Sequence, residues 1–197
     1  MTQNAEINAK KQAYVLGIAP GVRFRDFVAQ QRAAFFADEL ALHNVVVQPM
    51  RLPICSFHIE DSHFAELKMQ LLDWARYAHA QHVYCDTFKV NAFKGTVMLL
   101  PTLHSRSYLK DIFFHTQKLI RARCQLLTAE VEPHFPIAEG LSKSQSEALS
   151  LLLKRVDIDF FCDNLSLYPL AAHDADPQVL RFDFGNQKQP TGQLELF

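Results

Sequence analysis

The sequence predicts an α+β domain in which two pseudo-symmetric lobes of antiparallel sheet, with helices outside, surround a central groove. Three observations support this prediction. The 197 residues are 49% hydrophobic, which suits a packed core and excludes a disordered chain. Segments with helical periodicity alternate with short strand-like runs along the chain. Each half, of about 90 residues, contains a helix and a strand pair, as expected for layered α+β packing.

The first elements are a strand and a long helix. Residues 14–19 form an apolar run that ends at Pro20 and Gly21, a pattern typical of a strand followed by a turn. Phenylalanine and valine residues then recur at helical spacing, so we expect an amphipathic helix over 22–42.

Extended chain and a second helix follow. Residues 45–47 and 52–59 read as strands, and Pro49 and Pro53 confine them to turns or sheet edges. Leucine and alanine residues at helical spacing predict the second helix at 63–80.

The middle of the chain predicts a hairpin and a third helix. The strand-like runs 83–90 and 96–100 are separated by the turn-forming residues 91–95. Apolar residues along one side predict a helix over 105–126, and 131–138 reads as extended.

The last elements are a fourth helix and two strands. Ser144 and Glu147 have the spacing of a capping box, which predicts a helix from there to Arg155. Residues 159–168 and 179–184 read as strands. The domain prediction is therefore a polar segment at 1–12, a single bilobal domain at 13–185 and a C-terminal tail at 186–197.

Charge and cysteine usage restrict the function and the location. The net charge of −1 disfavours a broad nucleic-acid surface but leaves room for a small, locally basic pocket. The chain shows no secretion signal and no apolar stretch long enough to span a bilayer, so we expect a cytoplasmic protein without membrane contact. The four cysteines lie in apolar runs without a CxxC pair, as buried reduced thiols do: Cys55, Cys85, Cys124 and Cys162.

Two histidines stand on predicted strands in different parts of the chain. Alternation places His134, Pro136 and Ala138 on one strand face. In the segment PICSFHI, about 80 residues earlier, Ser56 and His58 share a face with Ile54. Two strands that each present a histidine to one groove suit acid-base chemistry.

These segments resemble a known family. The chain contains the segment PHFPIAEGL, then a predicted helix, then the segment FFCDNLSLYPL. This order resembles the C-terminal half of the two-histidine (2H) phosphoesterases, also called 2′-5′ RNA ligase-like proteins. PICSFHI lies where the first His-x-Thr/Ser motif of that family falls. The order of elements agrees over about residues 13–185.

The resemblance implies a metal-independent phosphodiesterase without a cofactor. Such an enzyme acts on a 2′,3′-cyclic phosphate or a 2′-5′ linkage in RNA or an oligonucleotide, by hydrolysis or reverse ligation. One histidine takes a proton from the attacking group and the other protonates the leaving oxygen. The hydroxyl two residues after each histidine binds phosphate oxygens. The expected ligand is a nucleotide, a cyclic phosphate or an RNA end.

Both motifs are degenerate. Pro136 stands in the hydroxyl position after His134. The first motif aligns in two ways. In the favoured alignment Ile54 replaces the histidine and Ser56 keeps the hydroxyl; in the other, His58 is the histidine and Glu60 replaces the hydroxyl. We therefore predict His134 and His58 as catalytic residues, with Ser56 binding the phosphate.

Several alternatives remain at the level of sequence. Lys94 is predicted to reach the phosphate, and otherwise it is a hairpin-tip lysine. The spacing of His79 and His82 suits a solvated helix end better than a metal site. The second functional hypothesis is that the protein is a catalytically inactive relative that binds a nucleotide or RNA end. A third is an interaction domain whose groove is closed by large residues: Ile54, Phe57 and Phe135.

Overall fold

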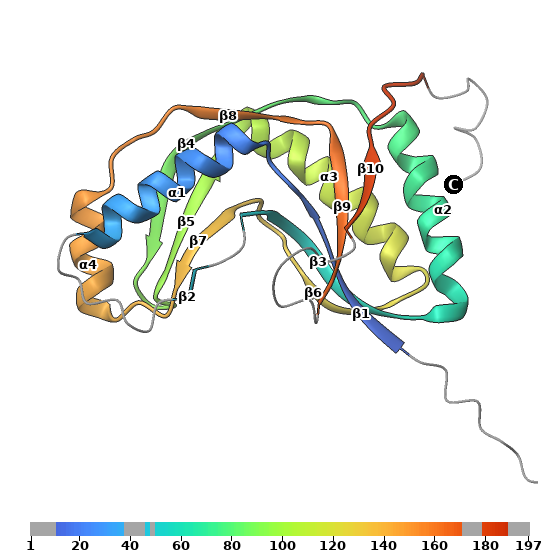
Figure 1. The fold of residues 1–197 in the computed structure, drawn as a ribbon, viewed down its shortest axis with the longest axis horizontal. Coiled ribbons are helices and arrows are strands. Elements are labelled where there is room, and N and C mark those ends of the chain that lie inside the picture. The colour runs from blue at the N-terminus through green and yellow to red at the C-terminus, as the bar shows by residue number, and fades with distance from the viewer. Residues whose placement is uncertain (1–10, 38–45, 48–49, 171–178, 189–197) are drawn as a thin grey trace, which may run out of the picture.

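The computed structural model of the protein describes residues 11–37, 46–47, 50–170 and 179–188 (Figure 1). The strands within these ranges are β1 (Lys11–Ile18), β2 (Val46–Val47), β3 (Leu52–Glu60), β4 (Gln81–Asn91), β5 (Thr96–Pro101), β6 (Gln125–Ala129), β7 (Phe135–Glu139), β8 (Ile158–Cys162), β9 (Asn164–Pro169) and β10 (Leu180–Asp183). The helices are α1 (Val22–Ala37), α2 (Asp61–Tyr77), α3 (Leu103–Arg121) and α4 (Lys143–Leu152).

The strands form two five-stranded antiparallel sheets. Sheet A has the order β10-β9-β1-β3-β6, and sheet B has the order β2-β7-β5-β4-β8. Helices α1 and α4 pack on sheet B, α2 packs on sheet A, and α3 contacts strands of both sheets. The two lobes together form an arch in Figure 1. The predicted α+β architecture is confirmed, although each sheet takes strands from both halves of the chain.

Most predicted elements are present, with two corrections. The helix expected over 105–126 ends at Arg121, and the chain turns into the unexpected strand β6. The strand expected over 159–168 is two strands, β8 and β9, which belong to different sheets. Residues 38–42 of the first predicted helix lie outside the described residues. The domain boundaries at 13 and 185 stay predictions, and most of 1–12 and 186–197 is likewise outside the described ranges.

The capping box of α4 lies two residues earlier than predicted. The Ser142 hydroxyl accepts from the Gln145 amide, and the Gln145 side chain accepts from the Ser142 amide. Both Ser142–Gln145 and Ser144–Glu147 fit the capping-box pattern. The structure uses the first, and the chain reaches it from β7 through Gly140, whose φ of 81° suits glycine.

Each lobe has its aromatic core between its sheet and its own helices. In the sheet B lobe, the Phe24 ring of α1 lies 4.8 Å from Phe135 and 5.1 Å from Phe160, between ring centroids. In the sheet A lobe, Tyr14 stacks on Phe57 and on Phe64 of α2. Phe57 and Phe135 are fully buried in these cores. They therefore stabilise the lobes and do not fill a groove between them.

A bulge interrupts each strand that carries a candidate motif. Leu16 pairs with Cys55 and Gly17 with Pro53, so the β1–β3 pairing skips Ile54. The β5–β7 pairing skips Ile137 in the same way. A bulge changes which residues face each side of the sheet. The face of β3 away from α2 consequently presents Pro53, Ser56 and His58, and Ile54 is fully buried.

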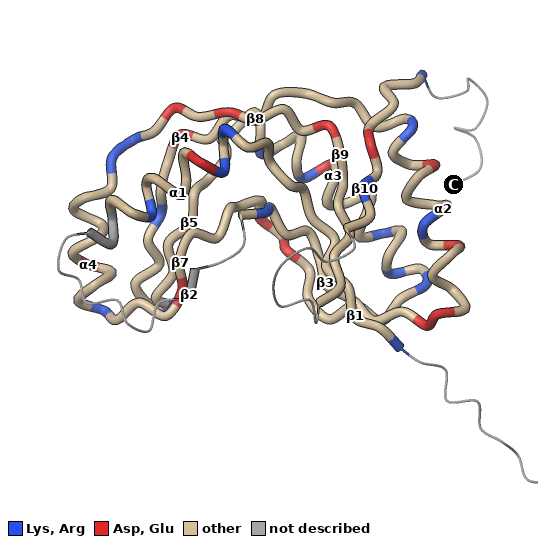
Figure 2. Tube along the Cα trace, viewed as in Figure 1, with Lys and Arg blue, Asp and Glu red and all other residues tan. Residues whose placement is uncertain are grey.

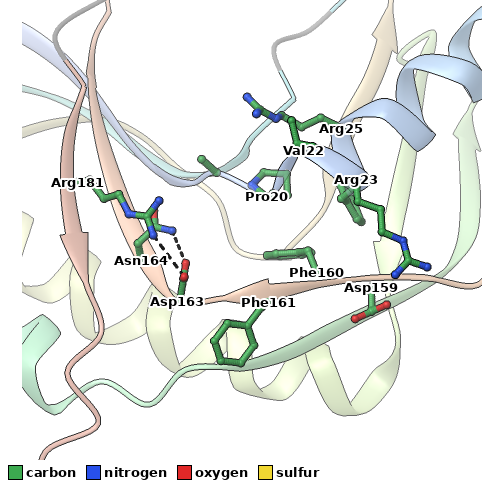
Figure 3. A pocket seen from close by; sticks show the side chains of 13 residues that line it. Pro20, Val22, Arg23, Arg25, Asp159, Phe160, Phe161, Asp163, Asn164 and Arg181 are labelled. Atoms are coloured by element: carbon green, nitrogen blue, oxygen red, sulfur yellow. Dashed lines mark hydrogen bonds and ion pairs between the residues drawn. The ribbon is translucent and has the colours of Figure 1, made fainter.

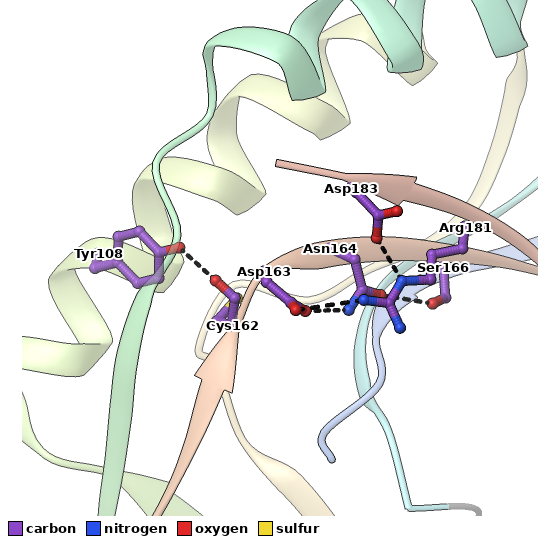
Figure 4. A network of polar contacts seen from close by, with 7 residues as sticks. All are labelled: Tyr108, Cys162, Asp163, Asn164, Ser166, Arg181 and Asp183. Carbon is purple, nitrogen blue, oxygen red and sulfur yellow. Dashed lines mark hydrogen bonds and ion pairs between the residues drawn. The ribbon is translucent and has the colours of Figure 1, made fainter. Parts of the chain in front are cut away.

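A polar network holds the crossing from β8 to β9, where the chain passes from one sheet to the other (Figure 4). The Asp163 carboxylate, between the two strands, accepts from the side-chain Nδ2 of Asn164 and pairs with Arg181 of β10. Arg181 also donates to Asp183. The Tyr108 hydroxyl of α3 donates to the His79 carbonyl at 2.7 Å, and the Cys162 carbonyl oxygen lies 3.5 Å from the same hydroxyl. These contacts connect the crossing to β10 of sheet A and to helix α3.

Candidate functional site

His134 immediately precedes β7 and is half-buried, between the buried residues Pro133 and Phe135. Its Nδ1 lies 2.8 Å from the carbonyl oxygen of Glu132. Because a carbonyl only accepts, Nδ1 carries the proton, and Nε2 is left to meet a ligand. An imidazole oriented in this way accepts a proton at Nε2 when neutral and donates one when charged.

His134 lines a cavity of about 260 Å³ together with residues of β4, β5 and β7 in sheet B and with Glu130, which follows β6 of sheet A. Pro136 and Ala138 line the same cavity. The bulge at Ile137 pairs them with the adjacent residues Met98 and Val97, so the regular alternation that predicted one shared face for His134, Pro136 and Ala138 is interrupted here. The polar side chains around it come from the β4–β5 hairpin, the end of β6 and the end of β7: Asn91, Lys94, Thr96, Glu130 and Glu139.

The β4–β5 hairpin brings Lys94 to this cavity. The Lys94 amide donates to the Asn91 side chain, and the next residue, Gly95, has a φ of 62°. The Gly95 carbonyl accepts from the Leu141 amide at 3.0 Å, beyond the end of β7. A Cβ atom at Gly95 would lie 2.2 Å from the Leu141 carbonyl oxygen, so only glycine allows this approach. The structure thus brings together two of the four predicted site residues, Lys94 and His134.

Ser56 and His58 lie elsewhere on β3. The Ser56 hydroxyl is 2.7 Å from the Thr128 hydroxyl of β6, and the Ser56 side chain is buried. His58 pairs with Ala13 and Gln125 across the sheet, and its Nδ1 is buried without a hydrogen-bond partner among the described residues. Neither residue lines the His134 cavity.

The end of β3 nearest this cavity is the Ile54 end. The Glu130 amide donates to the Ile54 carbonyl at 2.9 Å, and Glu130 also lines the His134 cavity. His58 is four residues farther along β3, or about 13 Å at the usual strand rise. The two predicted catalytic histidines therefore do not share the cavity, and their cooperation stays a prediction.

The sequence reasoning missed Glu130 and Thr96. Glu130 falls within a region expected to be the end of a helix and a loop, so no strand face could be assigned to it. Thr96 follows Lys94 at a spacing of two in the hairpin, which is a signal that would have grouped them.

A larger cavity, about 530 Å³, lies at the start of α1 (Figure 3). Its charged lining residues are of both signs: Arg23, Arg25, Asp159, Asp163 and Arg181. The Arg181 guanidinium is already paired with Asp163. None of the predicted site residues lines this cavity, so its size alone does not make it the candidate site.

Charges along the described chain are mixed. Figure 2 shows Lys and Arg interspersed with Asp and Glu over both lobes. His82, considered above beside His79, is 2.6 Å from Asp159. The described residues contain no group of three histidine, cysteine or acidic side chains placed to hold a metal. Among the described helices, none is both long and apolar enough for a membrane span.

Comparisons with known proteins identify the fold. No family model matches the chain, and no curated protein matches it in sequence. Solved structures do match. The E. coli LigT structure with 3′-AMP has a TM-score of 0.64 at 13% identity, over 87% of this chain and 95% of LigT. A structure described as a phosphoesterase has a TM-score of 0.61 at 15% identity, over 89% and 99% of the two chains.

Two further points come from these comparisons. The protein TT0787 of Thermus thermophilus has a TM-score of 0.57 at 7% identity and is covered over its full length, with 89% of this chain. Other solved E. coli LigT structures contain ATP or NADP⁺, so LigT binds small nucleotides. At such identities the likeness concerns the backbone. The chain has the LigT-like fold of the 2H phosphoesterases.

Proposed function

We propose that this protein is a metal-independent phosphodiesterase that acts on a 2′,3′-cyclic phosphate or a 2′-5′ linkage at a nucleotide or RNA end. The observation that carries the proposal is His134, whose Nδ1 is held by the Glu132 carbonyl while the ring lines the cavity that also contains Lys94. The LigT-like fold and the nucleotide ligands of LigT support it.

The chemistry follows from these groups. The Lys94 ammonium attracts the phosphate and offsets the negative charge that accumulates on its oxygens in the transition state. The His134 imidazole exchanges a proton with a reacting oxygen, a contribution of about 10²–10⁴-fold in rate. The sequence predicts His58 and Ser56 as the second histidine and the phosphate ligand; because neither lines this cavity, their part in the reaction stays a prediction.

A second function is a binding protein for a nucleotide or RNA end without turnover. The observation that favours it is the pair of replacements on the motif strands. Pro136 offers no hydroxyl beside His134, and the fully buried Ile54 offers no imidazole in the other lobe.

The test is turnover of 2′,3′-cyclic nucleotides and short 2′-5′ oligonucleotides in EDTA, with binding of the same compounds measured by calorimetry. We expect chelator-resistant turnover that falls at least about 100-fold in His134→Ala. Lys94→Ala weakens binding. His104→Ala is the matched control, because His104 is exposed on α3 and does not line the cavity. Binding without turnover would select the second function, and absence of both would overturn the proposal.

We also propose the cytoplasm as the location. All four cysteines are free thiols, and three of them are buried. Free thiols are typical of proteins in reducing compartments.

A further inference from the structure

Two-group acid-base catalysis at the His134 cavity needs a second titratable side chain there. The sequence offers none at Ile54, which is apolar and fully buried in the β3 bulge. The adjacent strand does offer one. Glu130 follows β6 directly, beside Ile54, and it comes from the lobe opposite to the one that carries His134.

The backbone at Glu130 is held firmly. Its amide donates to the Ile54 carbonyl at 2.9 Å. Gln117 of α3 donates through Nε2 to the same Ile54 carbonyl at 3.0 Å and to the Glu130 carbonyl at 2.8 Å. The bulge of β3, the end of β6 and helix α3 are thereby joined at one point. A side chain on such a rigid base has a defined position relative to the cavity.

The carboxylate itself is available. Glu130 is partly buried and lines the cavity with His134, and no described residue forms an ion pair or side-chain hydrogen bond with it. Two other acidic residues near the cavity, in contrast, already have interaction partners. Glu132 is paired with Lys110 at 2.6 Å, and Glu139 has an interaction of its own.

Resting on the proposed function, we propose that Glu130 is the second acid-base residue of this site and takes the place of the histidine missing at Ile54. Glu130 and His134 then face the phosphate from opposite lobes, with Lys94 at the phosphate oxygens.

The proton transfers balance with water as the attacking group. The Glu130 carboxylate takes a proton from the attacking water while the water oxygen forms a bond to phosphorus. The P–O bond to the ribose oxygen breaks, and protonated His134 gives its Nε2 proton to that oxygen. The product is a phosphomonoester beside a free ribose hydroxyl. Glu130 then returns a proton to solvent, and His134 takes one up.

This assignment predicts a bell-shaped pH profile of kcat/KM. Activity falls on the acid side when the base is protonated, and on the alkaline side when His134 loses its proton. The other charged groups at the cavity are Lys94 and Glu139, and Arg32 of α1 donates to the Pro136 carbonyl behind it. Gln117, from α3, is uncharged.

The experiment is kcat/KM for a 2′,3′-cyclic nucleotide against pH in wild type, Glu130→Gln, Glu139→Gln and His58→Gln. We expect Glu130→Gln to lose about 100-fold or more in kcat/KM and to lose the acid limb, while its binding of the product nucleotide is retained. Glutamine has the same size as glutamate, so we expect the fold to be retained. An unchanged midpoint of thermal unfolding checks this. Glu139→Gln removes an equal charge from the same cavity, and we expect it to keep the acid limb.

The outcomes separate this inference from the proposed function. An active wild type with the acid limb unchanged in Glu130→Gln overturns the role of Glu130 and leaves the phosphodiesterase in place. Loss of the limb in His58→Gln or Glu139→Gln instead also overturns it. A wild type without turnover overturns the proposed function itself.

Discussion

Pro136 lies two residues after His134 and lines the same cavity, where it offers a phosphate no hydrogen-bond donor. Pro136→Thr would add a hydroxyl on that face. Since a hydrogen bond to a charged group contributes about 1.5–3 kcal/mol, we expect at least about tenfold tighter binding of a nucleotide phosphate, measured by calorimetry. Pro136→Val is the matched control, because it has the same branched shape and backbone amide without the hydroxyl. Equal affinities in the two variants would contradict the prediction.

At this scale the sequence could predict His134 and Lys94 but not their neighbours. Each of the two belongs to a local sequence pattern: His134 to an alternating strand, and Lys94 to the turn of a hairpin. Glu130 reaches the cavity only because β6 pairs with β3, and the Cα partners nearest to it, Cys55 and Ala129, are 74 positions apart. Ile54 reads as one position of a regular strand, yet the bulge removes it from the alternation. Local periodicity contains no information about either effect.

At the scale of elements, the start of α4 gives a test of the capping box. Ser142→Ala removes the side-chain acceptor for the Gln145 amide, so we expect the free energy of unfolding to fall by about 1 kcal/mol. Ser144→Ala is the comparison, since Ser144 and Glu147 form the alternative box; we expect a change within about 0.5 kcal/mol. Urea unfolding measures both. A larger loss in Ser144→Ala would mean that the helix begins two residues later.

The elements whose type was predicted correctly are those with a strong local signal. The helices carry apolar residues at helical spacing, and β4 and β5 flank a turn that contains Gly95. The errors fall where tertiary pairing decides the outcome. Residues 125 and 126, predicted as the end of a helix, pair with β3 instead. The apolar run at 159–168 is divided at Asp163 because its ends pair in different sheets.

At the scale of the whole molecule, the arrangement of strands explains why a site between the lobes is possible. Sheet A combines β1 and β3 with three strands from the second half, and sheet B combines β2, β4 and β5 with β7 and β8. Neither lobe can therefore fold from one half of the chain. The cavity that contains Glu130 and His134 depends on this interleaving, since Glu130 follows β6 of sheet A and His134 precedes β7 of sheet B.

The interleaved cores also determine how stability depends on pH. Burial raises the pKa of the Cys55 and Cys162 thiols to about 12, and it raises the pKa of Cys85 as well. A pKa raised in the folded state means that the folded protein holds the proton more tightly than the unfolded chain does. The stabilisation is therefore complete below about pH 9 and is lost as the pH rises toward 12.

We expect the free energy of unfolding, measured in urea, to decrease above about pH 9 by about 1.4 kcal/mol per pH unit for each buried thiol. Cys55→Ala removes one such group, so its stability should fall less steeply with pH than that of wild type, whatever its absolute value. In the native protein at neutral pH, Cys124 should react first with a thiol reagent, because it is only partly buried. The three buried cysteines should react only when the protein unfolds. A slope that is identical in wild type and Cys55→Ala would show that this thiol does not contribute, and rapid reaction of all four cysteines would show that the two cores open readily in solution.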